Sequence, residues 1–177
     1  VARMLDIPTT VMEGLRRRDE EKLLRHELSV EHNDHARETL ERLATGELDE
    51  LTRLQIARRY LPGGETAPAT VVARLTVDES PQVRAAALET IGDLPDPVVE
   101  ALANDPESPR PLLAYLFRYG SKNVSAAAVL NPSMPLPALL EHAPACAIPA
   151  LEAFRERTDL LREHRELREA LRQNPKL

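Results

Sequence analysis

The sequence predicts an all-α protein, a stack of about ten short helices in a single domain, from three observations. Apolar residues recur at helical spacing along the 177-residue chain, and no stretch alternates polar and apolar residues as a half-buried strand does. Many of the 15 prolines stand at the start of an apolar segment, where their missing N–H costs nothing. Aromatic residues make up only 3% of the chain and Trp is absent, so Leu, Val and Ala must form the core.

The first third of the chain, residues 1–64, is predicted to form helical hairpins. The expected helices cover residues 9–28, 33–44 and 48–60. Charged residues interrupt the apolar stripe of the first, which fits either one long helix or two short ones divided near Asp19. Gly46 is the expected stop of the second helix, and the sequence Pro62-Gly63-Gly64 ends the third.

The stretch from Ser80 to Gly92 has the sequence signals of a helix together with both of its ends. Ser80 is expected to cap the first free N–H groups, and Pro81 fits the first helical position. Gly92 suits a left-handed stop. The face expected to be buried consists of Val83, Ala86, Ala87 and Ile91. Because alanine is small, this helix is predicted to approach its neighbours closely.

Residues 65–157 contain an imperfect internal repeat. Helix starts are marked by Pro68, Pro81, Pro97 and Pro109. Two groups of apolar residues occupy equivalent places 27 residues apart: Val71, Val72 and Leu75, then Val98, Val99 and Leu102. Each group precedes an acidic turn that contains proline. We therefore expect a repeat of two helices with a period of 27–28 residues, which is typical of a stacked helical array.

The repeat becomes less regular toward the C-terminus. Further helices are expected around residues 112–117, 124–129, 136–142, 147–156 and 159–173. The last has leucines on one face and alternating Arg and Glu elsewhere, including the pairs Arg162/Glu166 and Arg165/Glu169. A helix with polar outer faces suits the end of an array, so residues 158–177 are predicted to be its cap.

The segment from Asp78 to Gly92 resembles a HEAT repeat, whose second helix commonly opens Asp-x-x-Pro-x-Val-Arg and continues through alanines to Gly. The residues that carry the resemblance are Asp78, Pro81, Val83, Arg84, Ala87 and Gly92. The leucine-rich repeat variant family has a similar turn. The resemblance implies a HEAT-like α-solenoid, a right-handed superhelix of antiparallel helices, with its repeats over residues 65–157. It also implies that Asp78 and Arg84 tie adjacent turns together and that the protein binds other macromolecules.

Charge and cysteine content narrow the classes of partner. A net charge of −6 argues against general nucleic-acid binding, since such proteins usually present a basic face. The single cysteine, Cys146, rules out an intrachain disulfide and a cysteine-rich metal site, and it predicts a reducing, cytoplasmic setting. The sequence has no apolar run long enough to span a membrane and no signal-peptide pattern. It opens on Val1 rather than Met, and one interpretation is that the chain is a module of a larger protein.

Two clusters of Arg and Tyr are the predicted protein-binding residues, because exposed Arg and Tyr are enriched at interface hot spots. The candidates are Arg58, Arg59 and Tyr60, then Tyr115, Arg118 and Tyr119, together with Arg84. The alternative is that the tyrosines only cover the stack and leave their hydroxyls in water.

Three histidines near the N-terminus, His26, His32 and His35, form the one candidate metal site. Two of them are three residues apart and carboxylates lie nearby, which are ligands that Zn²⁺ accepts. The alternative, which we prefer, is an ordinary corner between two helices in which Asn33 or Asp34 is the N-cap. We therefore expect neither a metal nor another cofactor.

Taken together, the sequence predicts a non-enzymatic protein-binding or scaffold module that uses the concave face of a helical array and has another protein as partner. Two alternatives stay open at this stage. One is a HEAT-like nucleic-acid-processing enzyme of the DNA glycosylase type, and the other is a metal-dependent activity at the three histidines. The oligomeric state is not predicted.

Overall fold

The computed structural model describes residues 9–28, 34–61 and 64–177, and this part of the chain is all-α. Within it the only β pairing is one isolated bridge between Tyr60 and Thr66. Two short 3-10 helices, η1 (Leu75–Val77) and η2 (Ala143–Ala145), accompany the α-helices. The α-helices are α1 (Thr9–Leu28), α2 (Asp34–Thr45), α3 (Glu50–Ala57), α4 (Ala69–Arg74), α5 (Pro81–Gly92), α6 (Asp96–Asn104), α7 (Arg110–Tyr119), α8 (Lys122–Leu130), α9 (Leu136–His142), α10 (Ile148–Glu156), α11 (Thr158–Glu163) and α12 (Arg165–Arg172).

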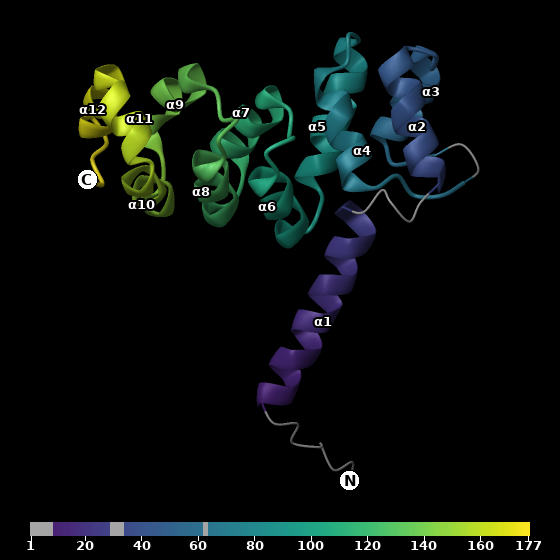
Figure 1. Cartoon of the computed structure of the whole chain (residues 1–177), viewed down its shortest axis with the longest axis horizontal. Helices are drawn as coiled ribbons and strands as arrows, with labels where there is room; N and C mark the ends of the chain where they lie inside the picture. Colours follow the sequence, from purple (N-terminus) through teal and green to yellow (C-terminus); the bar gives the residue numbers. More distant parts are fainter. Residues whose placement is uncertain (1–8, 29–33, 62–63) are drawn as a thin grey trace.

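Helices α2 to α12 form an elongated row, with α2 and α3 at one end and α11 and α12 at the other (Figure 1). The row has two layers. In the first layer α3 packs on α5, α7 packs on α9, and α9 packs on α12. In the second layer α4, α6, α8 and α10 pack on one another in that order. No helix among the described residues is both long enough and apolar enough to cross a membrane.

The core between the layers is built from aliphatic side chains and alanine, as the low aromatic content predicts. In α5 the expected face, Val83, Ala86, Ala87 and Ile91, is buried. Full burial of a side chain such as Ile91 contributes about 1.5–3 kcal/mol. The two phenylalanines, Phe117 and Phe154, meet edge to face with ring centroids 6.1 Å apart. They join the first layer to the second near the C-terminal half of the row.

The turns that follow helices of the second layer share one local geometry. The side-chain oxygens of Asp78 and Asp105 accept the backbone N–H two residues ahead, each at 2.9 Å. Asn131 accepts the N–H of Ser133 in the same way at 2.8 Å. These three turn residues are 27 and 26 residues apart, close to the period expected from the sequence. The same turn therefore recurs at nearly the interval that the sequence pattern suggests.

Asn131 also joins neighbouring repeats. Its buried side-chain amide donates to the carbonyl oxygens of Ala103 and Asp105, at 2.7 and 2.8 Å, where α6 ends. Arg157 then donates to the carbonyls of Val129 and Asn131, both at 3.1 Å, where α8 ends. The last carbonyls of a helix have no partner within that helix. The last carbonyls of α6 and of α8 are thus satisfied by a side chain that follows the next helix of the second layer.

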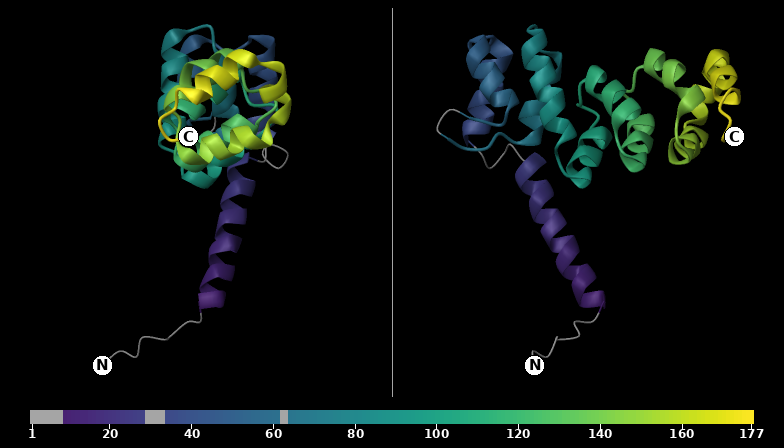
Figure 2. Two further views of the ribbon diagram at one scale, coloured as in Figure 1. Left: turned by 90° about the vertical axis from the view of Figure 1, so that its left-hand side faces the viewer. Right: turned by 180° about the vertical axis from the view of Figure 1, so that it is seen from behind.

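Helix α1 is a single helix, and it points away from the row (Figures 1 and 2). Its C-terminal part packs on α4 and α6 through Leu23, Leu24 and Leu28. The buried carboxylate of Glu27 accepts two bonds of 2.7 Å from Nη2 of Arg59. Charges that leave water must be paired, so this contact fixes where α1 meets the row.

Four expectations about helix ends are corrected by the structure. Ser80 does not cap α5 with its side chain; its hydroxyl donates to Glu50 instead. Gly92 has no left-handed conformation; it is the last residue of α5, and the C-cap residue Asp93 still has helical angles. The third helix ends at Ala57 rather than near Tyr60, because Arg59 turns to a φ of 71°.

The fourth correction concerns the expected helix over residues 159–173, which is two helices. His164 adopts extended angles, φ −113° and ψ 98°, between α11 and α12. Arg168 donates to the carbonyls of Leu161 and Arg162, at the end of α11 where the helix breaks. The pair Arg165–Glu169 forms at 2.7 Å within α12, whereas Glu166 lies near His164 and not near Arg162.

Candidate functional site

A groove of about 750 Å³ lies between α2 and the end of α4. Leu40 and Leu43 of α2 form one apolar side, and Leu75 and Val77 of η1 form the other. Ala44, Thr45, Gly46, Arg53, Arg74, Asp78 and Glu79 complete the lining. An apolar groove with a few polar groups at its edge is the usual form of a binding site.

The short helix η1 shapes the floor of the groove. Thr76 turns its hydroxyl back to the carbonyl of Ala73 at 2.7 Å, and the N–H of Asp78 bonds to Leu75 at 3.1 Å. This tight turn buries Leu75 and leaves Val77 52% exposed. Exposure of a valine to water is unfavourable, so burial of Val77 under a ligand makes the free energy of binding more favourable.

A smaller hollow of about 230 Å³ adjoins the groove, since Leu40 and Arg74 line both. Its other residues come mainly from α4 and from the turn between α6 and α7: Thr70, Ala73, Leu102, Asp105, Glu107, Ser108 and Pro109. The buried hydroxyl of Thr70 has no hydrogen-bond partner among the described residues. The combined surface runs from α2 across α4 to the next repeat.

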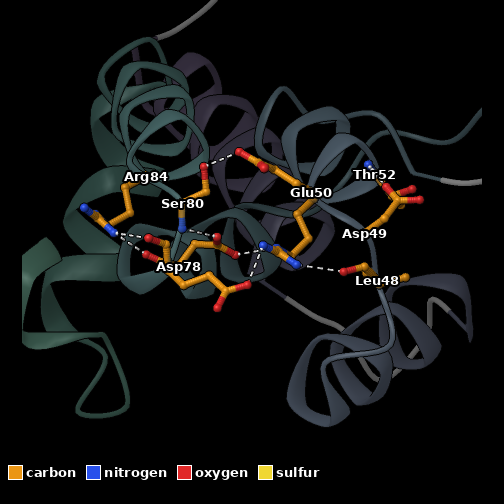
Figure 3. A network of polar contacts seen from close by, with 9 residues as sticks. Leu48, Asp49, Glu50, Thr52, Asp78, Ser80 and Arg84 are labelled. Carbon is orange, nitrogen blue, oxygen red and sulfur yellow. Dashed lines mark hydrogen bonds and ion pairs between the residues drawn. The ribbon is translucent and has the colours of Figure 1, made fainter.

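One edge of the groove is held by Arg53 of α3, which reaches to Asp78 in the turn before α5. Figure 3 labels Asp78 and the neighbouring residues Ser80, Arg84 and Glu50. Its Nε lies 2.9 Å from Oδ2 of Asp78, and its Nη2 lies 3.0 Å from Oε1 of Glu79. A third nitrogen donates to the carbonyl of Leu48 at 2.8 Å. Arg53 and Asp78 are nearly buried, so water screens this ion pair only weakly.

The same turn is held from the other side by α5. Nη1 of Arg84 donates to the carbonyls of Asp78 and Glu79, at 2.6 and 2.9 Å. The hydroxyl of Ser80 donates to Glu50 of α3 at 2.6 Å. Arg84, a predicted protein-binding residue, therefore uses its Nη1 group to stabilise the turn.

Two charged groups at the groove remain available to a ligand. Arg74 is exposed, and its one bond to a described residue joins Nη1 to the carbonyl of Glu107 at 3.1 Å. The carboxylate of Glu79 is 84% exposed although it touches Arg53. A guanidinium with free N–H groups beside an apolar floor can bind a carboxylate in a forked geometry.

The cluster of Tyr115, Arg118 and Tyr119 lies on α7, away from this groove. The two tyrosine rings are 5.1 Å apart at their centroids, and the guanidinium of Arg118 lies 5.0 Å over the ring of Tyr119. Arg118 also faces Glu141 of α9 at 3.6 Å. A Cβ at Gly92 would lie 3.4 Å from the hydroxyl of Tyr115, so this ring covers the end of α5.

The other predicted cluster divides between two roles. Arg59 is internal, since it binds Glu27 and donates to the carbonyl of Ala67 at 3.1 Å. Arg58 and Tyr60 are exposed. They border a hollow of about 460 Å³ on the outer side of α3, together with Leu51, Leu54 and Gln55.

The candidate metal site is only partly within the described residues. His26 and His35 are exposed, on α1 and α2, while His32 lies outside the described part of the chain. Among described residues, no three His, Cys, Asp or Glu side chains form a group that could hold a metal ion. Cys146 is buried and burial raises the pKa of its thiol, which disfavours the reactive thiolate.

Models of known protein families, curated proteins and solved structures give no match to this chain. The candidate site therefore stands on geometry alone. Most of its residues were not candidates on sequence grounds. Leu40 and Leu43 are expected there as core residues, and Arg74 carries no local signal. Val77 offers a weak one, since an apolar residue directly before an acidic turn falls outside the helical spacing of α4.

Proposed function

We propose that this chain is a non-enzymatic protein-binding module, a HEAT-like α-solenoid that binds a segment of a partner protein in the groove between α2 and η1. The observation that carries the proposal is an apolar floor on which Val77 is 52% exposed, beside Arg74, a cation with free donors. The Arg53–Asp78 ion pair holds the edge of this floor. The recurring turns at Asp78, Asp105 and Asn131 support the proposed repeat architecture.

The chemistry of the groove specifies the segment. Its floor of Leu40, Leu43, Leu75 and Val77 suits one or two aliphatic or aromatic side chains, and its volume falls in the range of sites that hold ligands of that size. Arg74 suits an acidic residue next to them. We therefore propose a short segment with an apolar anchor followed or preceded by Asp or Glu.

A nucleic acid suits the groove poorly. Two carboxylates, Asp78 and Glu79, stand at the edge beside the two arginines, and the chain carries a net charge of −6. Phosphate binding rests on uncompensated Lys and Arg. Arg53 is already neutralised by its two acidic neighbours.

Selection from a library of random peptides displayed on phage tests the proposal, with the purified protein as bait. We expect enrichment of peptides that combine an apolar residue with Asp or Glu. Val77→Asp should abolish the enrichment, because it places a charge on the apolar floor. Ile148→Asp is the matched control, since Ile148 is 56% exposed on the distant α10.

Charge reversal at the groove gives the sharper result. Arg74→Glu should change the preference from acidic to basic peptides, whereas Arg155→Glu, an exposed site on α10, should leave it acidic. Enriched peptides that bind Val77→Asp and Arg74→Glu as well as they bind the wild type would refute the groove as the binding site. A library from which nothing is enriched would refute the function.

A further inference from the structure

The two ends of the helical row differ in how they meet water. At the C-terminal end α12 buries Leu167 and Leu171 inward and presents exposed Arg165, Glu166 and Glu169 outward. At the other end α3 packs on α5 with one side, while Leu51 and Leu54 line a hollow on its outer side. Stacked repeat proteins require a polar outer face on their terminal repeats. The outer side of α3 instead presents Leu51, which is 67% exposed.

The apolar surface on the outer side of α3, called here the α3 end face, consists of Leu51, Leu54, Gln55, Arg58 and Tyr60. Leu51 and Tyr60 are each 67% exposed, the highest exposure among the large apolar side chains of the described residues. Leu51, Leu54 and Arg58 share a stripe along α3, since they are three and four residues apart. The opposite side of α3 is used internally, by the bonds of Glu50 and Arg53 to the turn before α5.

Charges at the α3 end face are divided between the two ends of α3, with acidic residues at one end and Arg58 at the other. Two exposed acidic residues, Glu47 and Asp49, stand shortly before Leu51 at the N-terminal end of α3. Arg58 stands at the other end, about 10 Å along the helix from Leu51. A parallel neighbour would place Arg58 against Arg58. An antiparallel copy places each Arg58 beside the acidic end of the other copy, with Leu51 and Leu54 between them.

We propose that the α3 end face is the contact between two copies of this chain, related by a two-fold axis that sets α3 antiparallel to its counterpart. Such an interface is isologous and closes at two copies. It involves few side chains, so the dimer is weak, at the low end of interface sizes. The proposal is independent of the groove, which lies on the other side of Arg53.

Sedimentation velocity over about 10–500 μM protein, a range suited to weak association, tests the dimer. We expect a monomer that converts to a dimer as concentration rises. Leu51→Glu should weaken association at least about tenfold, as loss of a central anchor does. Ile148→Glu is the matched control and should dimerise like the wild type. Val77→Asp should also dimerise normally, which separates this test from that of the groove.

Charge exchange tests the antiparallel orientation. Arg58→Glu and Glu47→Arg should each weaken self-association, since each places like charges together at both ends. Glu47 is the suitable acidic partner because its side chain is 63% exposed and its ion pair with Arg42 is long, at 4.0 Å. The two variants mixed together should associate with each other, because both charge contacts are then restored.

Three results would overturn the proposal. A monomer at every concentration would remove the dimer. Normal dimerisation of Leu51→Glu would place the contact elsewhere. Association that continues beyond two copies, or a mixture of the two charge variants that stays monomeric, would contradict the two-fold antiparallel arrangement.

Discussion

Arg53 Nε lies 2.9 Å from Asp78 Oδ2, and this ion pair connects α3 to the turn that begins α5. The side chains are only 14% and 7% exposed, so neither charge is well hydrated. Asp78 also orders its own turn by accepting the N–H of Ser80. One contact therefore holds the stacking of two helices and the edge of the proposed binding groove.

Removing one partner of this pair should destabilise the protein strongly. Asp78→Asn leaves the guanidinium of Arg53 nearly buried without its main countercharge. Loss of one partner from a buried pair typically costs 3–5 kcal/mol, and because Glu79 remains we expect about 3 kcal/mol. The unfolding midpoint in urea, together with its slope, measures this change.

The exposed pair Arg37–Asp34 is the control for that experiment. Its atoms are closer, at 2.7 Å, but its side chains are 58% and 86% exposed. Asp34→Asn should cost less than about 1 kcal/mol, because water screens the pair. Equal costs for the two variants would mean that the Arg53–Asp78 contact is not buried in solution.

Asn131→Ala should lower the stability of the protein by breaking the bonds between the end of α8 and the end of α6. The substitution leaves the carbonyls of Ala103 and Asp105 without their donor in a buried place. Buried groups left unsatisfied cost about 1–3 kcal/mol, and we expect a value near the upper end because two are involved. Thermal unfolding followed by circular dichroism measures it.

Two further variants separate the roles of the Asn131 side chain. Asn131→Asp keeps the acceptor for Ser133 but removes both donors, so it should be as damaging as alanine. Asn104→Ala removes an exposed amide that bonds within its own helix and should cost less than about 1 kcal/mol. A harmless Asn131→Asp would show that the amide donors do not hold the repeats together.

Gly120→Ala should destabilise the connection between α7 and α8 by steric conflict. A Cβ there would lie 2.5 Å from the carbonyl oxygen of Leu116 and 2.6 Å from Cγ1 of Val124. The first obstacle is backbone and cannot move aside, so we expect a loss of about 1–3 kcal/mol. Differential scanning calorimetry measures the shift.

The control is Gly92→Ala, at the end of α5. Its added methyl group meets only the hydroxyl of Tyr115, at 3.4 Å, and the backbone is helical. The change should be close to neutral, since alanine has the better helix propensity. If both alanine variants were equally stable, the predicted steric conflict at position 120 would be contradicted.

Asp49 should make the stability of α3 dependent on pH. Its carboxylate accepts the N–H of Thr52 at 2.7 Å, and this bond lowers the pKa below its ordinary value of 3.8. A pKa lowered by folding means that the charged form stabilises the folded state. The contribution is present above the ordinary pKa and disappears as the pH falls through the lowered one.

Comparing the unfolding free energies of wild type and Asp49→Ala from pH 7 to pH 2 measures this effect. The difference should be constant at neutral pH and shrink below about pH 4. Asp49→Asn still accepts the same bond, so its stability relative to the wild type should improve as the solution becomes more acidic. A difference between wild type and Asp49→Ala that does not change with pH would contradict the cap.

Local sequence patterns predicted much of the fold because helix starts and buried faces depend on nearby residues. The proline starts at Pro81 and Pro109 and the buried face of α5 are examples. The break at His164 could not be predicted, because the leucine stripe continues on both sides of it. What stabilises the break is Arg168, whose bonds back to α11 form only after the chain has turned.

The candidate site was less predictable than the fold. Its two sides, Leu40 with Leu43 and Leu75 with Val77, are more than 30 residues apart and meet only because α2 packs beside α4. Arg59 shows the converse. Its residue type suggested a binding surface, whereas the structure turns it inward onto Glu27. Composition indicates which residues can bind, but tertiary packing decides which of them face outward.

The central claim is that the groove between α2 and η1 is the binding site, and methyl NMR spectroscopy tests this claim most directly. The protein would be labelled at its Leu and Val methyl groups and titrated with the best peptide from the library selection. The account predicts that the largest shift changes fall on Leu40, Leu43, Leu75 and Val77, with the methyls of Leu51 and Leu167 unmoved. Changes confined to Leu51 and Leu54, or spread evenly over the row, would contradict it.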